Sequence, residues 1–346
     1  MAYTNIDDPS AHFQTKLWTG NNGSQSITND GNSNLQPDWI WQKQPDTATD
    51  HHLVDTSRGI TKVFEMIGGE TTESIYSSFD SNGFSVSTSG DTEFNASGQR
   101  QSSLQWKCNG GTTSTNTDGD VNSTVQVNTT AGFSIVQYVG TRDSITPPTG
   151  IGHGLGQKPN FIVVKNSGYD WIWYHSGSAF VSGDERYDWD WNSTASTTST
   201  AQFPTVPTSS VFYVGTGAQT NREGYNIVAY CFAEKQGYSK FGSYTGNGNA
   251  NGTFVYTGFK PAWVQVRQTS QQTTNWDTSR GAYNPVSDYQ VNSNTVVGSG
   301  QIDFLSNGFK LRTSGAPFNN SGDKYLFTAF AENPFVTSTG IPTTAR

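Results

Sequence analysis

Asp55-Thr56-Ser57-Arg58-Gly59 returns late in the chain as Asp277-Thr278-Ser279-Arg280-Gly281, and Ser81-Asn82-Gly83-Phe84 returns as Ser306-Asn307-Gly308-Phe309. Repetition of this kind indicates a scaffold that is used more than once. The spacing of the two motifs is too long for the coil of a solenoid or the blade of a propeller. We therefore expect copies of one structural unit of roughly 100 residues, which is the usual size of a domain.

Three copies align on four landmarks that always occur in the same order. Each copy has an aromatic pair before a glycine, a proline leading an aromatic and apolar run that ends in a base, a Gly-Phe turn or its equivalent, and a closing apolar segment. The second landmark reads Pro37-Asp38-Trp39-Ile40…Lys43, Pro159-Asn160-Phe161-Ile162…Lys165 and Pro261-Ala262-Trp263-Val264…Arg267.

The apolar runs have the pattern of strands. Residues 161–165 form a short β-branched run bounded by Pro and Asn-Ser-Gly, and residues 263–267 alternate between apolar and polar side chains. Helical periodicity is sparse. The sequence predicts an all-β chain of three tandem antiparallel β-sandwich domains, of jelly-roll or lectin-like type. The predicted core anchors are Trp39, Trp106, Phe161, Phe232, Trp263 and Phe330.

The copies set the predicted domain organisation. The first sandwich covers residues 1–108, the second 132–236 and the third 237–335, with a tail at 336–346. Residues 109–131 are mostly small and polar, with valines at alternate positions near their end. We expect this segment to be either a linker or an arm added to a neighbouring sheet.

Composition limits the class of partner. The chain has 20 Lys and Arg against 28 Asp and Glu, a net charge of −8, and no basic patch, so nucleic acid is not an expected partner. No apolar stretch is long enough to span a membrane, and the first residues lack the pattern of a secretory signal. Cys108 and Cys231 lie at non-equivalent positions and are expected to be reduced.

No residue pattern points to catalysis, a cofactor or a metal. Adjacent His51 and His52 on a strand would face opposite ways, which is poor geometry for one metal ion. His153 lies in a glycine-rich turn without the helix that a phosphate loop needs, and His175 occurs in the second copy only. Nucleophile-elbow, metalloprotease and paired-cysteine motifs are absent from the sequence.

One local anomaly is a candidate glycan site. In Asp184-Glu185-Arg186-Tyr187-Asp188-Trp189-Asp190-Trp191-Asn192, alternation would put Tyr187, Trp189 and Trp191 on one strand face and Asp188 and Asp190 on the other. Aromatic faces stack on sugar C–H surfaces and carboxylates accept hydroxyl hydrogen bonds. The same carboxylates suit calcium, and the aromatics also suit simple packing against the core or a neighbouring subunit.

The Asp-Thr-Ser-Arg-Gly motif is expected to be structural, with the Asp carboxylate and the Arg guanidinium paired across a turn. The second copy has His175-Ser176-Gly177-Ser178 near the corresponding place. The motif is therefore not predicted to be one ligand site used three times.

Several segments together resemble a known family. They are Tyr3-Thr4-Asn5-Ile6-Asp7-Asp8-Pro9-Ser10, Leu35-Gln36-Pro37-Asp38-Trp39-Ile40-Trp41, residues 55–62, Gly152-His153-Gly154-Leu155-Gly156, and Ala331-Glu332-Asn333-Pro334-Phe335. This combination resembles repeated-module structural proteins of marine tailed bacteriophages of the cyanophage type, often labelled tail-fibre or lectin-like. The module has no known function. The resemblance implies a virion component and carries over no catalytic residue.

The sequence thus predicts a non-enzymatic virion protein, most specifically a tail-fibre or tail-associated adhesion subunit that contacts host-surface glycan. Its expected partners are other virion proteins and further copies of itself, as a trimer by the resemblance alone. Exposed loops on sandwich modules suit recognition, and multivalency strengthens weak contacts. The alternatives are a capsid decoration or head-fibre protein, and a glycan depolymerase with converging carboxylates.

Overall fold

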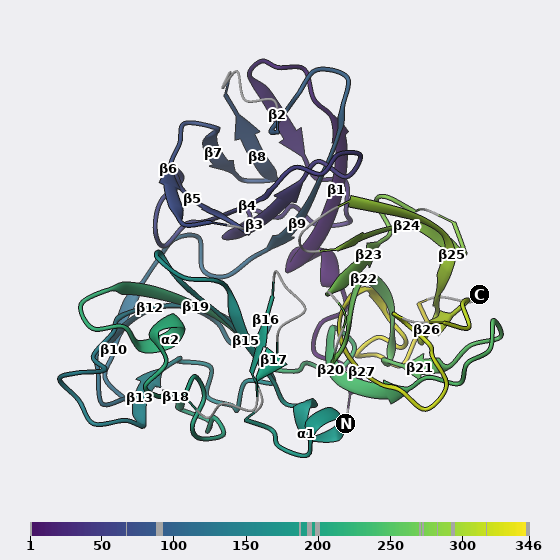
Figure 1. The fold of residues 1–346 in the computed structure, drawn as a ribbon. Helices are drawn as coiled ribbons and strands as arrows, with labels where there is room; N and C mark the ends of the chain where they lie inside the picture. The colour runs from purple at the N-terminus through teal and green to yellow at the C-terminus, as the bar shows by residue number, and fades with distance from the viewer. Residues whose placement is uncertain are drawn as a thin grey trace.

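A computed structural model describes residues 2–66, 68–87, 93–186, 188–191, 196–197, 201–269, 271, 273–281, 283–291, 295–315 and 317–343. The chain forms antiparallel sheets arranged in three groups around a common centre (Figure 1). The all-β prediction is confirmed, and helix is confined to three short segments among the described residues. These are η1 (Pro9–Ala11), α1 (Ser178–Ser182) and α2 (Ala218–Asn221).

The first copy contains two sheets. The larger has the order β1-β9-β3-β4-β5-β6 and the smaller β2-β8-β7. Their bounds are β1 (Phe13–Thr19), β2 (Gln25–Thr28), β3 (Trp39–Lys43), β4 (His51–Asp55), β5 (Lys62–Glu65), β6 (Glu70–Thr72), β7 (Tyr76–Asp80), β8 (Gly83–Val86) and β9 (Arg100–Trp106). A cluster that includes Ile40, Val54 and Phe84 fills the space between them, as a sandwich requires.

The second copy has a larger sheet in the order β10-β11-β12-β19-β14-β15-β16-β17 and a small one, β13-β18. The strands are β10 (Ser114–Asn116), β11 (Ser123–Asn128), β12 (Phe133–Val139), β13 (Thr149–Gly152), β14 (Phe161–Asn166), β15 (Ile172–His175), β16 (Asp188–Asp190), β17 (Ser196–Thr197), β18 (Val211–Val214) and β19 (Asn226–Phe232). Phe212 and Ile162 belong to the cluster that joins the two sheets.

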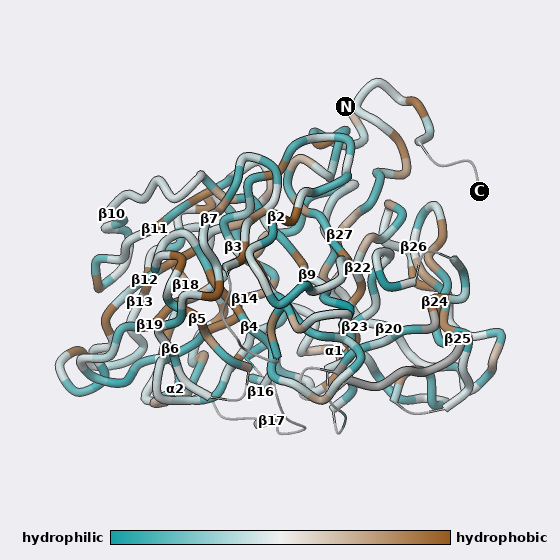
Figure 2. The backbone as a smooth tube through the Cα atoms, turned by 90° about the horizontal axis from the view of Figure 1, so that it is seen from above, coloured by the Kyte–Doolittle hydropathy of each residue, from teal (hydrophilic) through white to brown (hydrophobic). Residues whose placement is uncertain are grey.

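In the third copy one sheet of order β20-β27-β22-β23-β24-β25-β26-β21 supplies both layers. The strands are β20 (Ser239–Thr245), β21 (Phe254–Tyr256), β22 (Phe259–Gln268), β23 (Thr274–Asp277), β24 (Val286–Val291), β25 (Thr295–Leu305), β26 (Gly308–Leu311) and β27 (Lys324–Pro334). Phe309 and Phe327 lie in its cluster. Hydrophobic residues alternate with hydrophilic ones along many strands, while peripheral loops are mainly hydrophilic (Figure 2).

Strand register makes the three copies equivalent residue by residue. Trp39, Phe161 and Trp263 pair with Trp106, Phe232 and Phe330 respectively. On their other side the same three residues pair with Asp55, His175 and Asp277. All six predicted core anchors are buried, which confirms that prediction.

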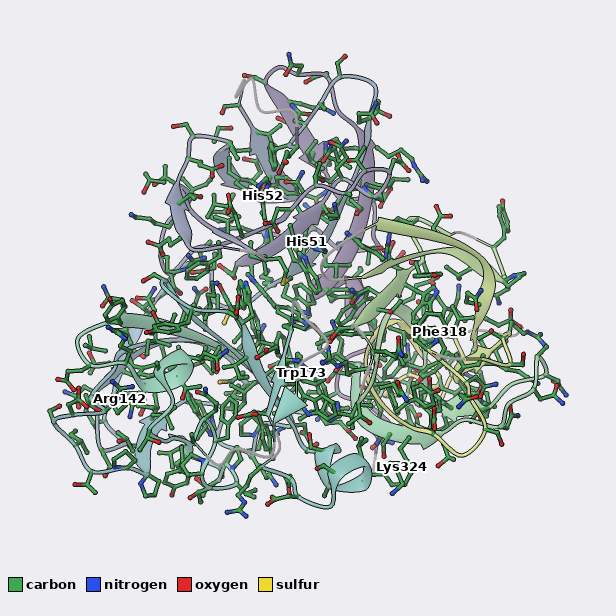
Figure 3. All side chains as sticks on the ribbon, in the orientation of Figure 1. His51, His52, Arg142, Trp173, Phe318 and Lys324 are labelled. Carbon is green, nitrogen blue, oxygen red and sulfur yellow. The ribbon has the colours of Figure 1, made fainter. Side chains whose placement is uncertain are left out.

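The largest aromatic side chains form a central cluster shared by all three copies, which the prediction of three tandem sandwich domains did not include. Trp106, Phe232 and Phe330 contact one another as a triangle, with ring-centroid distances of 6.1, 5.7 and 5.5 Å. Around them lie aromatics from every copy, and Figure 3 shows Trp173 where the three groups of sheets meet. Each large sheet therefore packs on two cores, its own peripheral cluster and the central cluster.

The connector between the first two copies forms β10 and β11, which extend the larger sheet of the second copy at its edge. The sequence left open a linker or an arm added to a neighbouring sheet, and the structure shows the arm. Asp38 fixes its start, because the buried carboxylate accepts hydrogen bonds from the backbone N–H groups of Cys108, Gly110 and Gly111. At the far ends of the described chain, Ser338 donates two hydrogen bonds to Asp7.

The base that ends each second landmark is buried. The Lys165 ammonium donates to the carbonyl of Gly68 in the first copy, and the Arg267 guanidinium donates to the carbonyl of Asp190 in the second. The Lys43 ammonium donates to carbonyls of its own copy. Burial lowers the pKa of Lys43 and that of Lys165 from 10.5 to about 8.

We expect the protein to become more stable between pH 7.5 and pH 9.5. The folded lysines release their protons near pH 8, whereas the unfolded chain holds them up to about pH 10.5, so the burial cost is relieved across this window. The gain should be about 1–2 kcal/mol per lysine. Denaturant titrations at the two pH values measure it, and Lys165→Met should lose about half of the gain. A fall in stability over this window would contradict the expectation.

None of the described helices is long and apolar enough to cross a membrane.

Candidate functional site

The predicted glycan segment faces inward. Trp189 and Trp191 are 0% and 1% exposed, and both belong to the central cluster. Trp191 packs against Trp41 and Trp171 at ring-centroid distances of 4.6 and 5.4 Å. Trp189 stacks on Trp173 and its indole N–H donates to the Ser178 hydroxyl. Neither ring has a face free for a sugar, so the glycan interpretation of these tryptophans is wrong and the packing alternative describes them.

The other residues of that candidate set are placed as follows. Tyr187 and Asn192 lie outside the described residues. Asp188 is buried, and Asp190 is half-buried, with its carboxylate 3.4 Å from the Gln219 amide nitrogen. Among the described residues there is no group of three or more His, Cys, Asp and Glu side chains that could hold a metal ion.

His51 and His175 make internal hydrogen bonds. His51 accepts a hydrogen bond from the Trp41 indole, and both His51 and His52 lie in the first copy (Figure 3). His175 accepts from the Gly177 N–H at Nδ1, so Nε2 carries the proton that it donates to the Phe327 carbonyl of the third copy. Burial lowers the pKa of His175 to about 4, which keeps the ring neutral at physiological pH.

The Asp-Thr-Ser-Arg-Gly motif forms the predicted turn in both places. Asp55 accepts from the backbone N–H groups of Ser57 and Arg58 and pairs with the Arg58 guanidinium at 2.6 Å. Asp277 accepts from the Arg280 N–H and pairs with its guanidinium. The structural interpretation of this motif is therefore confirmed. Each turn also meets another copy. Tyr230 of the second copy donates to the Asp55 carboxylate at 2.7 Å, and Asp277 and Arg280 line a small space together with Ser102 of the first copy.

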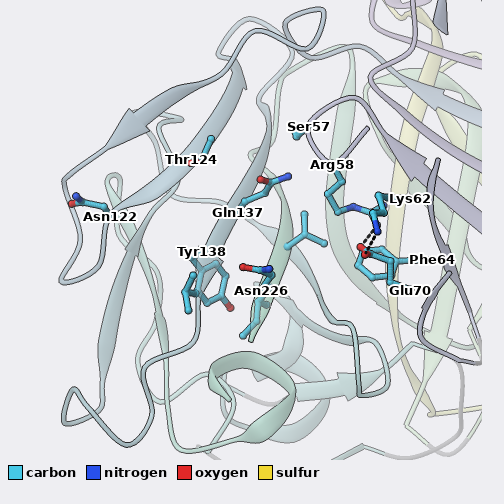
Figure 4. Close-up of a pocket in the computed structure, with 13 residues that line it drawn as sticks. Ser57, Arg58, Lys62, Phe64, Glu70, Asn122, Thr124, Gln137, Tyr138 and Asn226 are labelled. Atoms are coloured by element: carbon cyan, nitrogen blue, oxygen red, sulfur yellow. Dashed lines mark hydrogen bonds and ion pairs between the residues drawn. The ribbon is translucent and has the colours of Figure 1, made fainter. Parts of the chain in front are cut away.

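A cleft of about 410 Å³ opens beside the first of these turns, between the first and second copies (Figure 4). The first copy contributes Ser57 and Arg58 from the turn, Lys62 and Phe64 from β5, and Glu70 from β6. The second copy supplies the opposite wall from β11 and the residue before it, β12 and β19, through Asn122, Thr124, Gln137, Tyr138, Val139, Asn226, Ile227 and Val228. We call this the inter-copy cleft.

Charged groups lie on one wall of the inter-copy cleft. Arg58 stacks on the Phe64 ring, with its guanidinium carbon 3.6 Å from the ring centroid, and pairs with Glu70 at 3.1 Å. The Lys62 ammonium donates to the Thr72 hydroxyl and lies 3.6 Å from the Glu70 carboxylate. Arg58 is thus held by Asp55, Glu70 and Phe64, whereas the Lys62 side chain remains 42% exposed.

The opposite wall carries uncharged polar groups. Within the described part of the chain, the side chains of Asn122, Thr124, Gln137 and Asn226 make no intramolecular hydrogen bond. The Tyr138 hydroxyl, in contrast, donates to the Thr220 carbonyl at 2.6 Å. These amides and the hydroxyl, which have no partner in the described ranges, lie beside the apolar Phe64, Val139 and Val228. Together they can bind a ligand that has both hydroxyls and C–H faces.

Sequence reasoning missed the inter-copy cleft because its walls come from strands far apart in the chain. Ser57 and Arg58 were singled out, but only as a turn. Gln137 and Asn226 lie in strands whose other residues are mostly apolar, and no local pattern marks them. The one available signal was that the repeated copies differ at these positions.

Comparisons with known proteins give one match. A family model described as a domain of unknown function, DUF7483, matches residues 8–334, from the residue that caps η1 to the last residue of β27. The matched range thus includes all three copies and the central cluster between them. No curated protein and no solved structure matches the chain.

Proposed function

Because the chain belongs to DUF7483, a family of domains of unknown function, we propose its function from the inter-copy cleft: it is a non-enzymatic adhesion protein that binds surface glycan there. The observation that carries this proposal is the wall of amides and a hydroxyl that have no hydrogen-bond partner among the described residues, set opposite a stacked Arg58–Phe64 pair. The volume of about 410 Å³ lies in the range of small-ligand sites and suits one or two sugar rings.

Binding is favoured over hydrolysis by the carboxylates of the inter-copy cleft. Glycoside hydrolysis normally needs two carboxyl groups placed on either side of the scissile bond. Among the described lining residues Glu70 is the one carboxylate, and it is paired with Arg58 and faces Lys62. A depolymerase that uses Glu70 is the second candidate function, and an experiment described below distinguishes it from adhesion.

The location of such an adhesion protein rests on the sequence resemblance. That resemblance supports a tailed-phage virion, with the chain as a trimeric tail-fibre or tail-associated subunit that contacts the host. A capsid decoration protein is the alternative. Locating the labelled chain in intact virions by cryo-imaging separates the two, because tail and capsid positions are distinct.

We expect Gln137→Ala and Asn226→Ala each to weaken glycan binding about three- to tenfold, because each removes one or two hydrogen bonds to the ligand. Binding to an array of bacterial-surface oligosaccharides, followed by titration of the best one, measures the loss. Asn251→Ala removes an amide that is also exposed, in the third copy, and serves as the matched control. If Asn226→Ala and Asn251→Ala bind alike, the ligand does not occupy the cleft.

The same oligosaccharides test the enzymatic alternative. Incubation of the protein with the intact polysaccharide should leave its chain length unchanged. Shortening of the polymer that is abolished by Glu70→Gln would replace the adhesion proposal with a depolymerase.

A further inference from the structure

The three copies contact one another in a cyclic order. At each interface, the equivalent turn of one copy faces the next copy. The turn after β4 faces the second copy, the turn after β15 faces the third, and the turn after β23 faces the first. By register, Arg100, Asn226 and Lys324 are equivalent, since they pair with Thr19, Val139 and Thr245 at the ends of equivalent strands. Three equivalent clefts can therefore be compared within one chain.

The cleft between the third and first copies is closed by an ion pair. Arg100 of the first copy lies 3.1 Å from the Asp288 carboxylate of the third. Beside the Arg280 turn, a space of about 10 Å³ lies between Arg280 and Gln290 on one side and Ser102 on the other. The chain itself thus supplies a cation and a carboxylate that span the opening.

The cleft between the second and third copies is filled by a helix. Ser178 takes the place of Arg58 and begins α1, which packs against β27. The Lys324 ammonium lies 5.0 Å from the centroid of the Phe180 ring on that helix. Gly177 fits so closely that an added Cβ would lie 3.1 Å from Leu326.

Among the described residues, neither an ion pair across the opening nor a helix closes the inter-copy cleft between the first and second copies. Asn226 stands at the position of Arg100 and is too short and uncharged to reach across. Continuing the strand registers places Lys62 opposite Asp55, as Asp288 is opposite Asp277. A cation thus occupies the position from which a carboxylate closes the equivalent cleft, and Figure 4 shows Lys62 on the wall across from Gln137 and Asn226.

We propose that the inter-copy cleft selects a carboxylate-bearing saccharide, whose carboxylate pairs with Lys62 and whose hydroxyls bond to Asn226 and Gln137. This inference rests on the proposed glycan-binding function and specifies its ligand class. The ligand supplies the carboxylate that Asp288 supplies in the closed cleft. Asp55 and Glu70 balance Arg58 and Lys62, so the site is locally neutral in a chain of net charge −8, and an acidic group meets less repulsion at the exposed Lys62 than over the rest of the surface.

The test is an array of acidic bacterial-surface oligosaccharides in two matched forms, native and carboxyl-reduced, probed with the full chain. Native forms should bind about three- to tenfold more tightly than their reduced counterparts. That preference should shrink between 0.05 and 0.5 M NaCl, because salt screens exposed ion pairs. Lys62→Met should abolish the preference while retaining binding of the reduced forms. Lys260→Met, which removes an ion-paired lysine of the third copy, should leave the preference intact.

The outcomes separate the two proposals. If native and reduced forms bind equally and Lys62→Met has no effect, the glycan proposal stands and the acidic specificity is overturned. If no oligosaccharide binds in either form, the glycan-binding proposal itself fails, and the acidic specificity fails with it.

Discussion

Replacing Phe232 with alanine is expected to lower the free energy of unfolding by about 3–5 kcal/mol and to destabilise all three copies at once. The Phe232 ring contacts Trp106 in the first copy, Phe133 in its own and Phe330 in the third, at centroid distances of 6.1, 4.6 and 5.5 Å. Its removal leaves a void at the point where the copies meet. Each large sheet buries one face against this central cluster, so the void destabilises the sheets of all three copies.

Scanning calorimetry with hydrogen exchange measured for each copy checks this expectation. A single transition should move to lower temperature, with faster exchange in the strands of all three copies. Phe254→Ala is the matched control, because that ring is 44% exposed on β21 and should change stability by less than about 0.5 kcal/mol. Separate transitions, with only the second copy affected, would show that the copies are independent domains.

Transplanting the closing ion pair is expected to abolish binding at the inter-copy cleft. Asn226→Arg with Lys62→Asp introduces a guanidinium and a carboxylate at the positions that Arg100 and Asp288 occupy in the closed cleft. The new pair should span the opening and exclude the ligand, with a loss of affinity of 100-fold or more, on the order of 3 kcal/mol. Partial exposure should limit the effect of the pair on stability to about 1 kcal/mol.

Titration with the best-binding oligosaccharide measures the loss, and the melting temperature shows that the fold is kept. Lys260→Met, which removes an ion-paired lysine of the third copy, is the control and should leave binding at the inter-copy cleft unchanged. Unaltered affinity in the Asn226→Arg, Lys62→Asp variant would mean that the ligand binds elsewhere.

Much of the fold was predictable because the repeated landmarks are local. A proline followed by an aromatic and a β-branched run specifies a strand with little help from the rest of the chain, and the six predicted anchors are all buried. The pairing of Asp55 with Arg58, and of Asp277 with Arg280, was also predictable, because three residues across a tight turn bring the two groups together.

The direction in which a strand face points was not predictable. Alternation correctly puts Trp189 of β16 and Trp191 just after it on the same side, but it does not say whether that side meets solvent or another copy. The central cluster decides this, and it depends on the arrangement of three distant segments. The role of Asn226 in leaving the cleft open was likewise not predictable, because only the strand registers show that it is equivalent to Arg100 and Lys324.

The cyclic order of the copies has a mechanical consequence for the inter-copy cleft. A cleft between two units joined at one point can open and shut as a hinge, and its ligand must then organise both walls. Here the third copy contacts both copies that form the cleft. Its Phe327 carbonyl accepts a hydrogen bond from His175 of the second copy, and its Asp288 pairs with Arg100 of the first. These two contacts hold the cleft walls at a fixed separation, so a ligand that binds there loses little free energy to ordering the protein.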